Sequence, residues 1–170
     1  MAKQDKLALI NQLKDALLLY SLVSQDYDSD TRDYGLSQAL GREIRLHPIE
    51  IHLLSAIHAH PGISAQELGG MFFRSKGAIS QRIKVLFNYG FITKTPSPDN
   101  HRINRLYTTE SGALACLHHA QYDQTRYQKY LDILQDYSPR DVETCTQIIL
   151  LLTRALHGRG SVELNDGAAR

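Results

Sequence analysis

The 170 residues are 42% hydrophobic and 22% charged, and the formal net charge is +1. This is the composition of a soluble globular protein, and the length suffices for one domain, or two intimately joined ones, around a buried core. It excludes a disulfide framework, because the two cysteines lie far apart, and no apolar run approaches the roughly 18 residues of a membrane span. The N-terminal pattern contains acids and predicts no signal peptide, so we expect a cytoplasmic protein without a membrane partner.

Apolar spacing predicts that the N-terminal part of the chain is helical. Residues 5–24 repeat Leu, Ile and Tyr at intervals typical of a helix with one apolar face. The acidic stretch at 26–30 predicts a break or a loose turn. Residues 36–45 then predict another short helix.

The central part of the chain predicts three short helices followed by two strands. Residues 48–60 form the first helical pattern, with a proline in its first turn. A capping box at 64–67 starts the second, which ends around Gly69-Gly70, and a serine-capped third helix over 75–90 ends at a glycine. Residues 91–95 and 103–109 predict strands joined by a turn rich in Pro, Asp and Asn.

Two longer helices are expected after the strands, one from Glu110 to about residue 134 and one from a cap at 138–141 to about residue 157. The terminal helices carry more apolar surface than a module of about 65 residues needs, which favours a dimer interface over packing within a monomer. The predicted fold is mainly α with a small β-wing: a winged helix-turn-helix flanked by N- and C-terminal dimerisation helices. The expected division is an N-terminal dimerisation segment (1–45), a DNA-binding domain (46–109), C-terminal dimerisation helices (110–157) and a disordered tail (158–170).

Positive charge is concentrated in one part of the chain. From Arg74 to Arg105 there are seven Lys or Arg residues and one acid, Asp99, which gives this stretch a charge of +6 and leaves −5 for the remainder. Charge separated in this way is typical of a surface that binds a polyanion. Together with the order helix, strand, basic turn, strand, it predicts a winged helix-turn-helix that binds double-stranded DNA.

The segment from about Leu46 to Gly112 resembles the MarR family of bacterial transcription regulators. The similarity covers HPGISAQELGGMFFRSKGAISQRIKVLFNYGFITKTPSPDNHRINRLYTTESG, which is similar to that family's winged helix-turn-helix and the start of its next helix. Three segments look most like one branch of the family: EIH at 50–52, KGAISQ at 76–81 and PDN at 98–100. The resemblance implies a homodimeric transcription regulator, a repressor that releases DNA when it meets an effector.

The helix over residues 75–90 is the expected reader of the major groove. Burial of its apolar stripe turns a polar face outward, and Gln81 on this face can pair with adenine through two hydrogen bonds. Lys76 and Lys84 are expected to bind phosphate groups, which fixes register without reading sequence. The expected DNA contacts on this helix are Ser75, Lys76, Gly77, Ser80, Gln81 and Lys84.

The turn between the two strands is the expected wing. Arg102 is the expected minor-groove probe, with His101 and Arg105 beside it. The alternative for Arg105, and also for Lys94, is a solvated position on a strand. Asn100 stands where the family pattern has an aspartate, so the wing is expected to be supported by Asp99 or by hydrogen bonds.

A metal is one candidate effector. His119 and Asp123 are four residues apart on the long helix and share a face. With His52 they are similar in position to the ligands of zinc-responsive members of the family, and three such ligands suit zinc. Asp33 or Glu50 could complete the set. The alternative is that His52 packs at an interface and His119 is a polar surface residue.

Two further triggers remain open. Cys116 and Cys145 would sense oxidants if one had a lowered pKa, although both lie in apolar helical patterns. A small organic effector would find polar-tipped aromatic side chains near the junction of the dimer and DNA-binding parts. The tyrosines concerned are Tyr20, Tyr34, Tyr122 and Tyr127.

Two rival functions are disfavoured by the sequence. It contains no GxSxG, P-loop, HExxH or Gly-rich dinucleotide motif, so an enzyme is not expected. A winged module that binds protein instead of DNA typically lacks the exposed basic face and the wing arginine. Both are present here.

Overall fold

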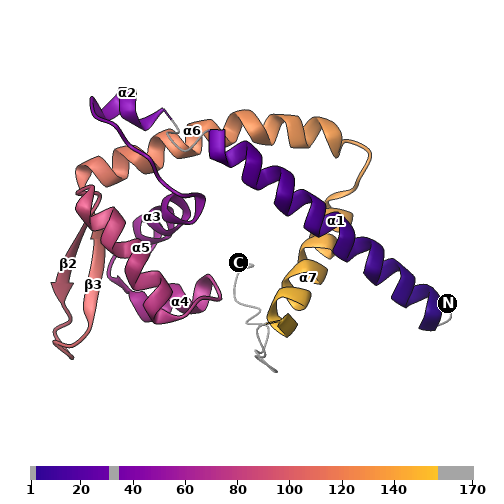
Figure 1. Ribbon diagram of the computed structural model, residues 1–170, viewed down its shortest axis with the longest axis horizontal. Helices are drawn as coiled ribbons and strands as arrows, with labels where there is room; N and C mark the ends of the chain where they lie inside the picture. Colours follow the sequence, from indigo (N-terminus) through magenta and orange to yellow (C-terminus); the bar gives the residue numbers. More distant parts are fainter. Residues whose placement is uncertain (1–2, 31–34, 157–170) are drawn as a thin grey trace. The chain divides into compact units, whose positions relative to one another are not determined.

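The computed structural model describes residues 3–30 and 35–156, and side chains within 6–24, 35–124 and 126–156. Two compact units are present, residues 1–122 and 123–170, and helix α6 runs through their boundary. The elements in chain order are α1 (Lys3–Asp30), α2 (Leu36–Leu40), α3 (Pro48–Ala59), β1 (Ile63–Ser64), α4 (Ala65–Met71), α5 (Lys76–Asn88), β2 (Ile92–Pro96), β3 (Asn104–Thr108), α6 (Glu110–Ile133) and α7 (Pro139–Leu156) (Figure 1). The predicted class, mainly α with a small β-wing, is confirmed. The expected tail at 158–170 lies outside the described residues, and the four-part division of the chain stays a prediction.

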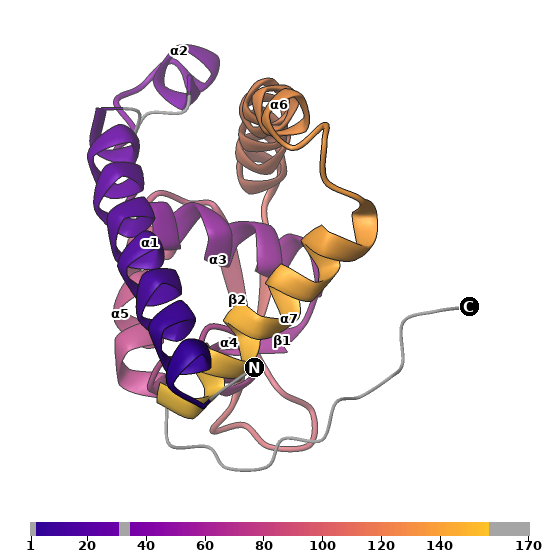
Figure 2. The same cartoon turned by 90° about the vertical axis from the view of Figure 1, so that its right-hand side faces the viewer.

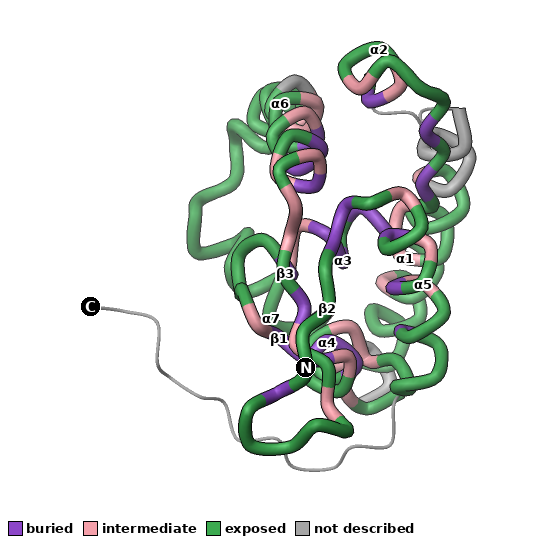
Figure 3. Tube along the Cα trace, turned by 90° about the vertical axis from the view of Figure 1, so that its left-hand side faces the viewer, coloured by how far each residue is buried: buried purple, intermediate pink, exposed green. Residues whose placement is uncertain are grey.

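The core of the first unit lies where α3, α4 and α5 meet the sheet. Both capping boxes place their helices as the local sequence dictates: the side chain of His47 caps α3, and that of Ser64 caps α4. Helix α3 buries Leu53, Leu54 and Ile57 completely, and further core residues come from α2, α4, α5, the strands and the start of α6. Figure 3 shows buried positions on α3, α4, α5 and the sheet and also on α2 and the start of α6, whereas α1 and α7 are exposed along most of their length.

The sheet has three antiparallel strands in the order β1-β3-β2. In the register of the sheet, Arg105 of β3 pairs with Ser64 of β1 on one side and with Thr95 of β2 on the other. The two-residue strand β1 was not predicted, because so short a strand leaves no alternation to detect. In Figures 1 and 2 the hairpin formed by β2 and β3 extends beyond α4.

Two predictions about the N-terminal region are wrong. Helix α1 continues through the acidic stretch to Asp30 instead of breaking at 26. Adding a residue to an existing helix costs little even for Asp, at most about 0.7 kcal/mol relative to Ala, so acidic composition alone does not stop a helix. The short helix expected over 36–45 ends at Leu40, because Gly41 adopts a left-handed conformation with φ of 63°.

The expected absence of a membrane-length apolar segment also needs correction. By length and composition alone, residues Lys6–Ser24 of α1 could cross a membrane. Their mean hydropathy is 1.2, and none of these residues is buried in the structure. A search for an uninterrupted apolar run misses this segment because Lys14 and Asp15 divide it. A helix whose apolar face is covered by another protein chain meets the same length and composition test.

Helix α7 begins at the cap that the sequence predicts. Ser138 Oγ accepts a hydrogen bond from the Asp141 amide, and the Asp141 carboxylate accepts one from the Ser138 amide. The Ser138 hydroxyl also donates to the Asp141 carboxylate at 2.6 Å, and this bond, followed by the one from the Ser138 amide, holds the pKa of Asp141 below its usual value. In the described residues no side chain of α7 is buried, although the helix carries a strong apolar stripe that includes Val142, Ile149 and Leu152.

The start of α6 is locked to the turn that follows α5. Thr109 Oγ1 donates to Gly90 O at 2.7 Å and accepts from the Gly112 amide at 3.1 Å. Helix and turn approach so closely that a Cβ on Gly112 would lie 2.0 Å from the backbone oxygen of Phe91. Only glycine fits at this position without moving the main chain.

Gly112→Ala is therefore expected to destabilise the first unit, and Gly70→Ala provides the matched control. Overpacking should cost about 1–3 kcal/mol or more for Gly112→Ala. Gly70 is exposed in α4 with open space around it, so Gly70→Ala should be neutral or stabilise by about 0.5–1 kcal/mol. Urea unfolding followed by circular dichroism measures both changes. Equal stability of the two variants would contradict the close approach.

Candidate nucleic-acid interface

Helix α5 turns a polar face outward because its apolar stripe is buried. Ser75 caps the helix by accepting a hydrogen bond from the Ala78 amide at 3.2 Å, as predicted. The stripe residues Ile79, Ile83 and Leu86 are at most 3% exposed. The exposed set on the other side contains every residue expected from the sequence: Ser75, Lys76, Gly77, Ser80, Gln81 and Lys84. Their contacts with DNA stay predictions.

An ion pair between a half-exposed arginine and a buried carboxylate fixes α5 against α3. Arg82 Nη1 donates to Glu50 Oε1 at 3.0 Å, and the Glu50 side chain is 4% exposed. The second oxygen of Glu50 accepts from the His47 amide at 2.8 Å, so one carboxylate both caps α3 and holds α5. Sequence reasoning missed this pair: Arg82 was counted with the basic surface, and Glu50 was considered as a metal ligand. Asp33, the other candidate considered for that role, lies outside the described residues.

Hydrogen bonds support the wing tip, which is one of the two alternatives that the sequence left open. Asn100 Oδ1 accepts from the Arg102 amide at 3.0 Å, and Asn100 O accepts from the Ile103 amide at 2.9 Å. The Ser97 amide donates to Ile103 O at 2.8 Å and closes the hairpin loop. His101 and Arg102 are exposed at this tip.

The wing and the helices enclose a small basic cleft, which we call the α5–wing cleft. It has a volume of about 150 Å³ and is lined by three cations, Lys76, Lys94 and Arg102, together with Ser64 and Ser80. Lys94 Nζ lies 4.5 Å from the centre of the Phe87 ring, a cation–π distance that ties this strand residue to α5. Three positive side chains from three elements make the cleft a favourable place for an anion.

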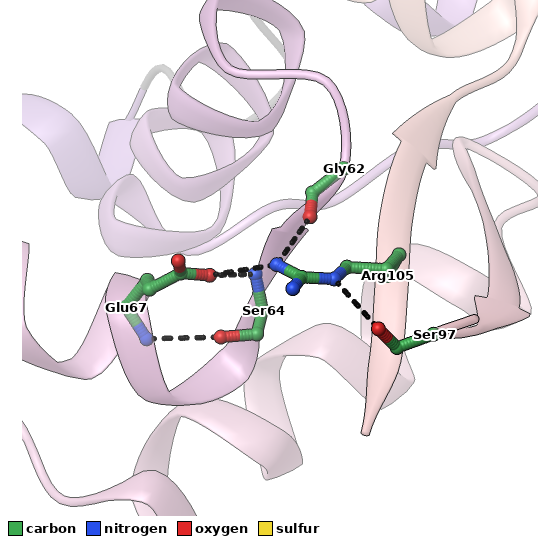
Figure 4. A network of polar contacts seen from close by, with 5 residues as sticks. All are labelled: Gly62, Ser64, Glu67, Ser97 and Arg105. Atoms are coloured by element: carbon green, nitrogen blue, oxygen red, sulfur yellow. Dashed lines mark hydrogen bonds and ion pairs between the residues drawn. The ribbon is translucent and has the colours of Figure 1, made fainter. Parts of the chain in front are cut away.

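Arg105 is held differently from Arg102, although both were expected at the DNA surface. Its guanidinium contacts Gly62, Glu67 and Ser97 within the module (Figure 4). Its side chain is 33% exposed. Sequence reasoning did not find these partners, because Glu67 lies 38 positions away along the chain.

Two of the three candidate metal ligands lie near each other. The rings of His52 and His119 meet edge to face with centres 5.3 Å apart, and His119 is buried. Asp123 belongs to the second unit. In the part of the chain that the structure describes, no group of three or more His, Cys, Asp or Glu side chains could hold a metal ion. The metal site therefore stays a prediction.

The two cysteines have different surroundings. Cys116 is buried, and burial raises the pKa of its thiol to about 11, with a hydrogen bond to Ser55 acting weakly in the other direction. Cys145 is exposed on α7. A protonated, buried thiol is a poor nucleophile, so this environment favours a packing role for Cys116. Of the tyrosines considered for an effector, Tyr20 and Tyr127 are exposed, Tyr122 packs partly buried against the core, and Tyr34 lies outside the described residues.

Comparison with known proteins identifies the central module. The model of the MarR family matches residues 46–103. A curated relative, the uncharacterized HTH-type transcriptional regulator YvnA of Bacillus subtilis (strain 168), is 25% identical over 123 residues, which is 72% of this chain and 71% of the relative. The crystal structure of the transcriptional regulator SlyA has a TM-score of 0.65 at 19% identity over 85% of this chain and 95% of its own. Streptococcus pneumoniae FabT in complex with DNA has a TM-score of 0.63 at 15% identity over 89% and 99%.

The cysteine environments predict unequal alkylation. At pH 8 and without denaturant, Cys145 should react with iodoacetamide well before Cys116, because Cys116 remains protonated below its raised pKa. The rate at Cys116 should rise only as the pH approaches about 11. Peptide mass spectrometry over a time course measures both sites, and the unfolded chain is the control in which the two should react alike. If Cys116 reacts faster than Cys145 in the folded chain, this prediction is wrong and Cys116 becomes a candidate oxidant sensor.

Proposed function

We propose that the chain, whose residues 46–103 match the model of the MarR family, is a winged helix-turn-helix transcriptional regulator of that family, a ligand-responsive repressor that binds a pseudo-palindromic operator as a homodimer. The observation that carries this proposal is the exposed polar face of α5 bordered by the basic α5–wing cleft. Helix, wing and cations converge on one surface, as groove reading requires. Its place of action would be the cytoplasm.

Sequence would be read by the exposed side of α5 in the major groove. Gln81 would pair with a base, with Ser80 as a second reader, because an amide can satisfy both hydrogen-bonding groups of adenine. Gly77 would let the backbone approach the duplex. Ser75, Lys76 and Lys84 would contact phosphate groups and set the register. All of these positions are exposed, on α5 or at its N-cap.

The wing would follow the neighbouring minor groove. Arg102 would enter it, with His101 beside it, because both are exposed at the tip of the hairpin. Lys94, held by Phe87, would add charge at the edge of the α5–wing cleft. Narrow minor grooves concentrate negative potential, which favours an arginine there.

A second copy of the chain would cover the apolar terminal helices. Exposed large side chains in α1 include Leu18, Leu19 and Val23, each at least 60% exposed. Helix α7 exposes a similar stripe. Surfaces of this kind mark an interface with another chain, and a two-fold dimer would present two α5 helices to half-sites about one helical turn apart, on an operator of very roughly 16–20 base pairs.

The effector would be a small organic molecule, with zinc or another metal as the alternative. The metal alternative rests on the edge-to-face pair of His52 and His119. Among the side chains that the structure describes, within 6–24, 35–124 and 126–156, no third ligand joins that pair, and the organic effector is preferred. A winged module that binds only protein is the less favoured alternative, because it would have no use for the exposed basic residues of the cleft.

Arg102→Ala and Gln81→Ala are expected to change DNA binding in different ways. Removal of the Arg102 guanidinium should weaken binding to every duplex and lower the salt slope by about 0.9 for each phosphate group that is no longer neutralised. Removal of the Gln81 amide should mainly change sequence preference, by about 1–3 kcal/mol between the right and the wrong base. Fluorescence titrations at several salt concentrations, with a selected duplex and a scrambled one, measure both effects.

Glu43→Gln is the control for this experiment, since Glu43 pairs with Arg45 on the surface and lies in neither α5 nor the wing. It should bind like the unaltered chain. If Arg102→Ala and Gln81→Ala also bind like the unaltered chain, the assignment of helix and wing to DNA is wrong.

A further inference from the structure

We propose that Arg105 is a positioning residue, which ties the wing to the start of α4 and acts on DNA through the placement of Arg102 instead of touching DNA itself. This inference rests on the proposed DNA-binding function and assigns a different role to one cation of the basic stretch. The cations around the wing then have two roles: some are exposed to DNA, and others hold the wing in position.

Arg105 occupies the central position of the sheet. It lies on the middle strand, β3, where its Cα pairs with Ser64 of β1 on one side and Thr95 of β2 on the other. From this position its side chain can reach both the wing and the turn that leads into α4. A residue on an edge strand would reach only one of them.

The guanidinium uses this position to join two parts of the module. Nη1 donates to Gly62 O at 3.2 Å and lies 3.4 Å from Glu67 Oε2, on the side of α4. Nε donates to Ser97 Oγ at 3.4 Å, at the base of the wing. Figure 4 shows the guanidinium lying between these two groups of partners. Ser97 is 1% exposed, so the wing end of this link is inside the fold.

Glu67 connects the link to the helix cap. The oxygen that faces Arg105, Oε2, also accepts from the Ser64 amide at 2.7 Å, while Ser64 Oγ accepts from the Glu67 amide at 3.2 Å. The hydrogen bonds from Ser64, and more weakly the charge of Arg105, hold the pKa of the Glu67 carboxyl below its usual value. The carboxylate therefore stays charged at neutral pH and balances the charge of Arg105.

Arg102 lies three positions earlier in the chain, and its side chain is exposed where that of Arg105 is paired with a carboxylate. It is exposed and lines the α5–wing cleft. Its charge is available to a polyanion, whereas the charge of Arg105 is offset by Glu67. A wing already held in place loses less conformational freedom when it enters a groove, so the brace should raise affinity without adding a phosphate contact.

The test compares two matched variants, Arg105→Met and Arg102→Met, which each keep an apolar stem and lose the guanidinium. Dissociation constants for a selected duplex are measured at several salt concentrations. Arg102→Met should lower the salt slope by about 0.9. Arg105→Met should weaken binding at every salt concentration while leaving the slope unchanged.

A double-mutant cycle with Glu67→Gln identifies the partner. If Arg105 acts through Glu67, the two substitutions should be non-additive, with a coupling of about twofold or more in the dissociation constant. Arg105→Lys should recover part of the affinity because it restores the charge. Hydrogen exchange without DNA should speed up at the amides of residues 97–104 in Arg105→Met, whereas the global urea midpoint reports whether the variant folds. Should Arg105→Met fail to fold, Glu67→Gln, at an exposed carboxylate, carries the same expectation of weaker binding with an unchanged slope.

Three results would overturn the proposal. A drop in slope for Arg105→Met equal to that for Arg102→Met, with effects that simply add to those of Glu67→Gln, would place Arg105 on a phosphate and leave the proposed function intact. Unchanged affinity and unchanged wing exchange in Arg105→Met would show that there is no brace. Absence of duplex binding by the unaltered chain would remove the proposed function and this inference together.

Discussion

The burial of one apolar stripe on α5 decides which side chains this protein can show to DNA. Ile79, Ile83 and Leu86 are buried in the core, so rotation of α5 about its axis would expose apolar surface and is resisted by the hydrophobic effect. The buried carboxylate of Glu50 adds a directional constraint, because Arg82 must stay within reach of it. Breaking such a pair leaves an uncompensated buried charge, which is strongly destabilising. The polar face of α5 is outward because no other orientation satisfies both constraints.

The basic residues around this helix fall into two groups with different physical roles. Arg82 and Arg105 each pair with a carboxylate of the module, Glu50 and Glu67 respectively. The displayed group consists of exposed residues just before α5, on α5, on β2 and on the wing: Arg74, Lys76, Lys84, Lys94 and Arg102. Counting charge along the sequence therefore overstates the charge that a polyanion meets. The two paired arginines set the position of the surface, and the displayed group determines how strongly salt weakens binding.

Local signals in the sequence were enough to place the helices of the central module. The capping box at Ser64, the serine cap at Ser75 and the glycine after α5 all act within a few residues, so each was found by spacing alone. The cap at His47 was not predicted, because histidine is not among the residues preferred at an N-cap. Hydrophobic periodicity likewise gave the exposed face of α5. Continuation of α1 through its acidic end was missed because helix propagation depends weakly on composition.

Contacts between distant residues could not be found in this way. Glu50 lies 32 positions from Arg82, and Glu67 lies 38 positions from Arg105, so neither pair leaves a local pattern. Strand β1 forms because β3 offers an edge to Ile63 and Ser64, and its own two residues carry no periodicity. Charge alone predicts that Arg105 contacts DNA. The proposed role in holding the wing depends on the positions of Gly62, Glu67 and Ser97 around its guanidinium, which only the structure gives.

Hydroxyl-radical and dimethyl sulfate footprinting of the unaltered chain would test the central claim most directly. The substrate is a duplex selected by the protein from a random library. If two α5 helices enter the major groove through a homodimer, two protected segments should appear about 10–10.5 base pairs apart, each flanked by minor-groove protection from the wing. A single protected segment, or protection of the backbone without major-groove protection, would contradict the account.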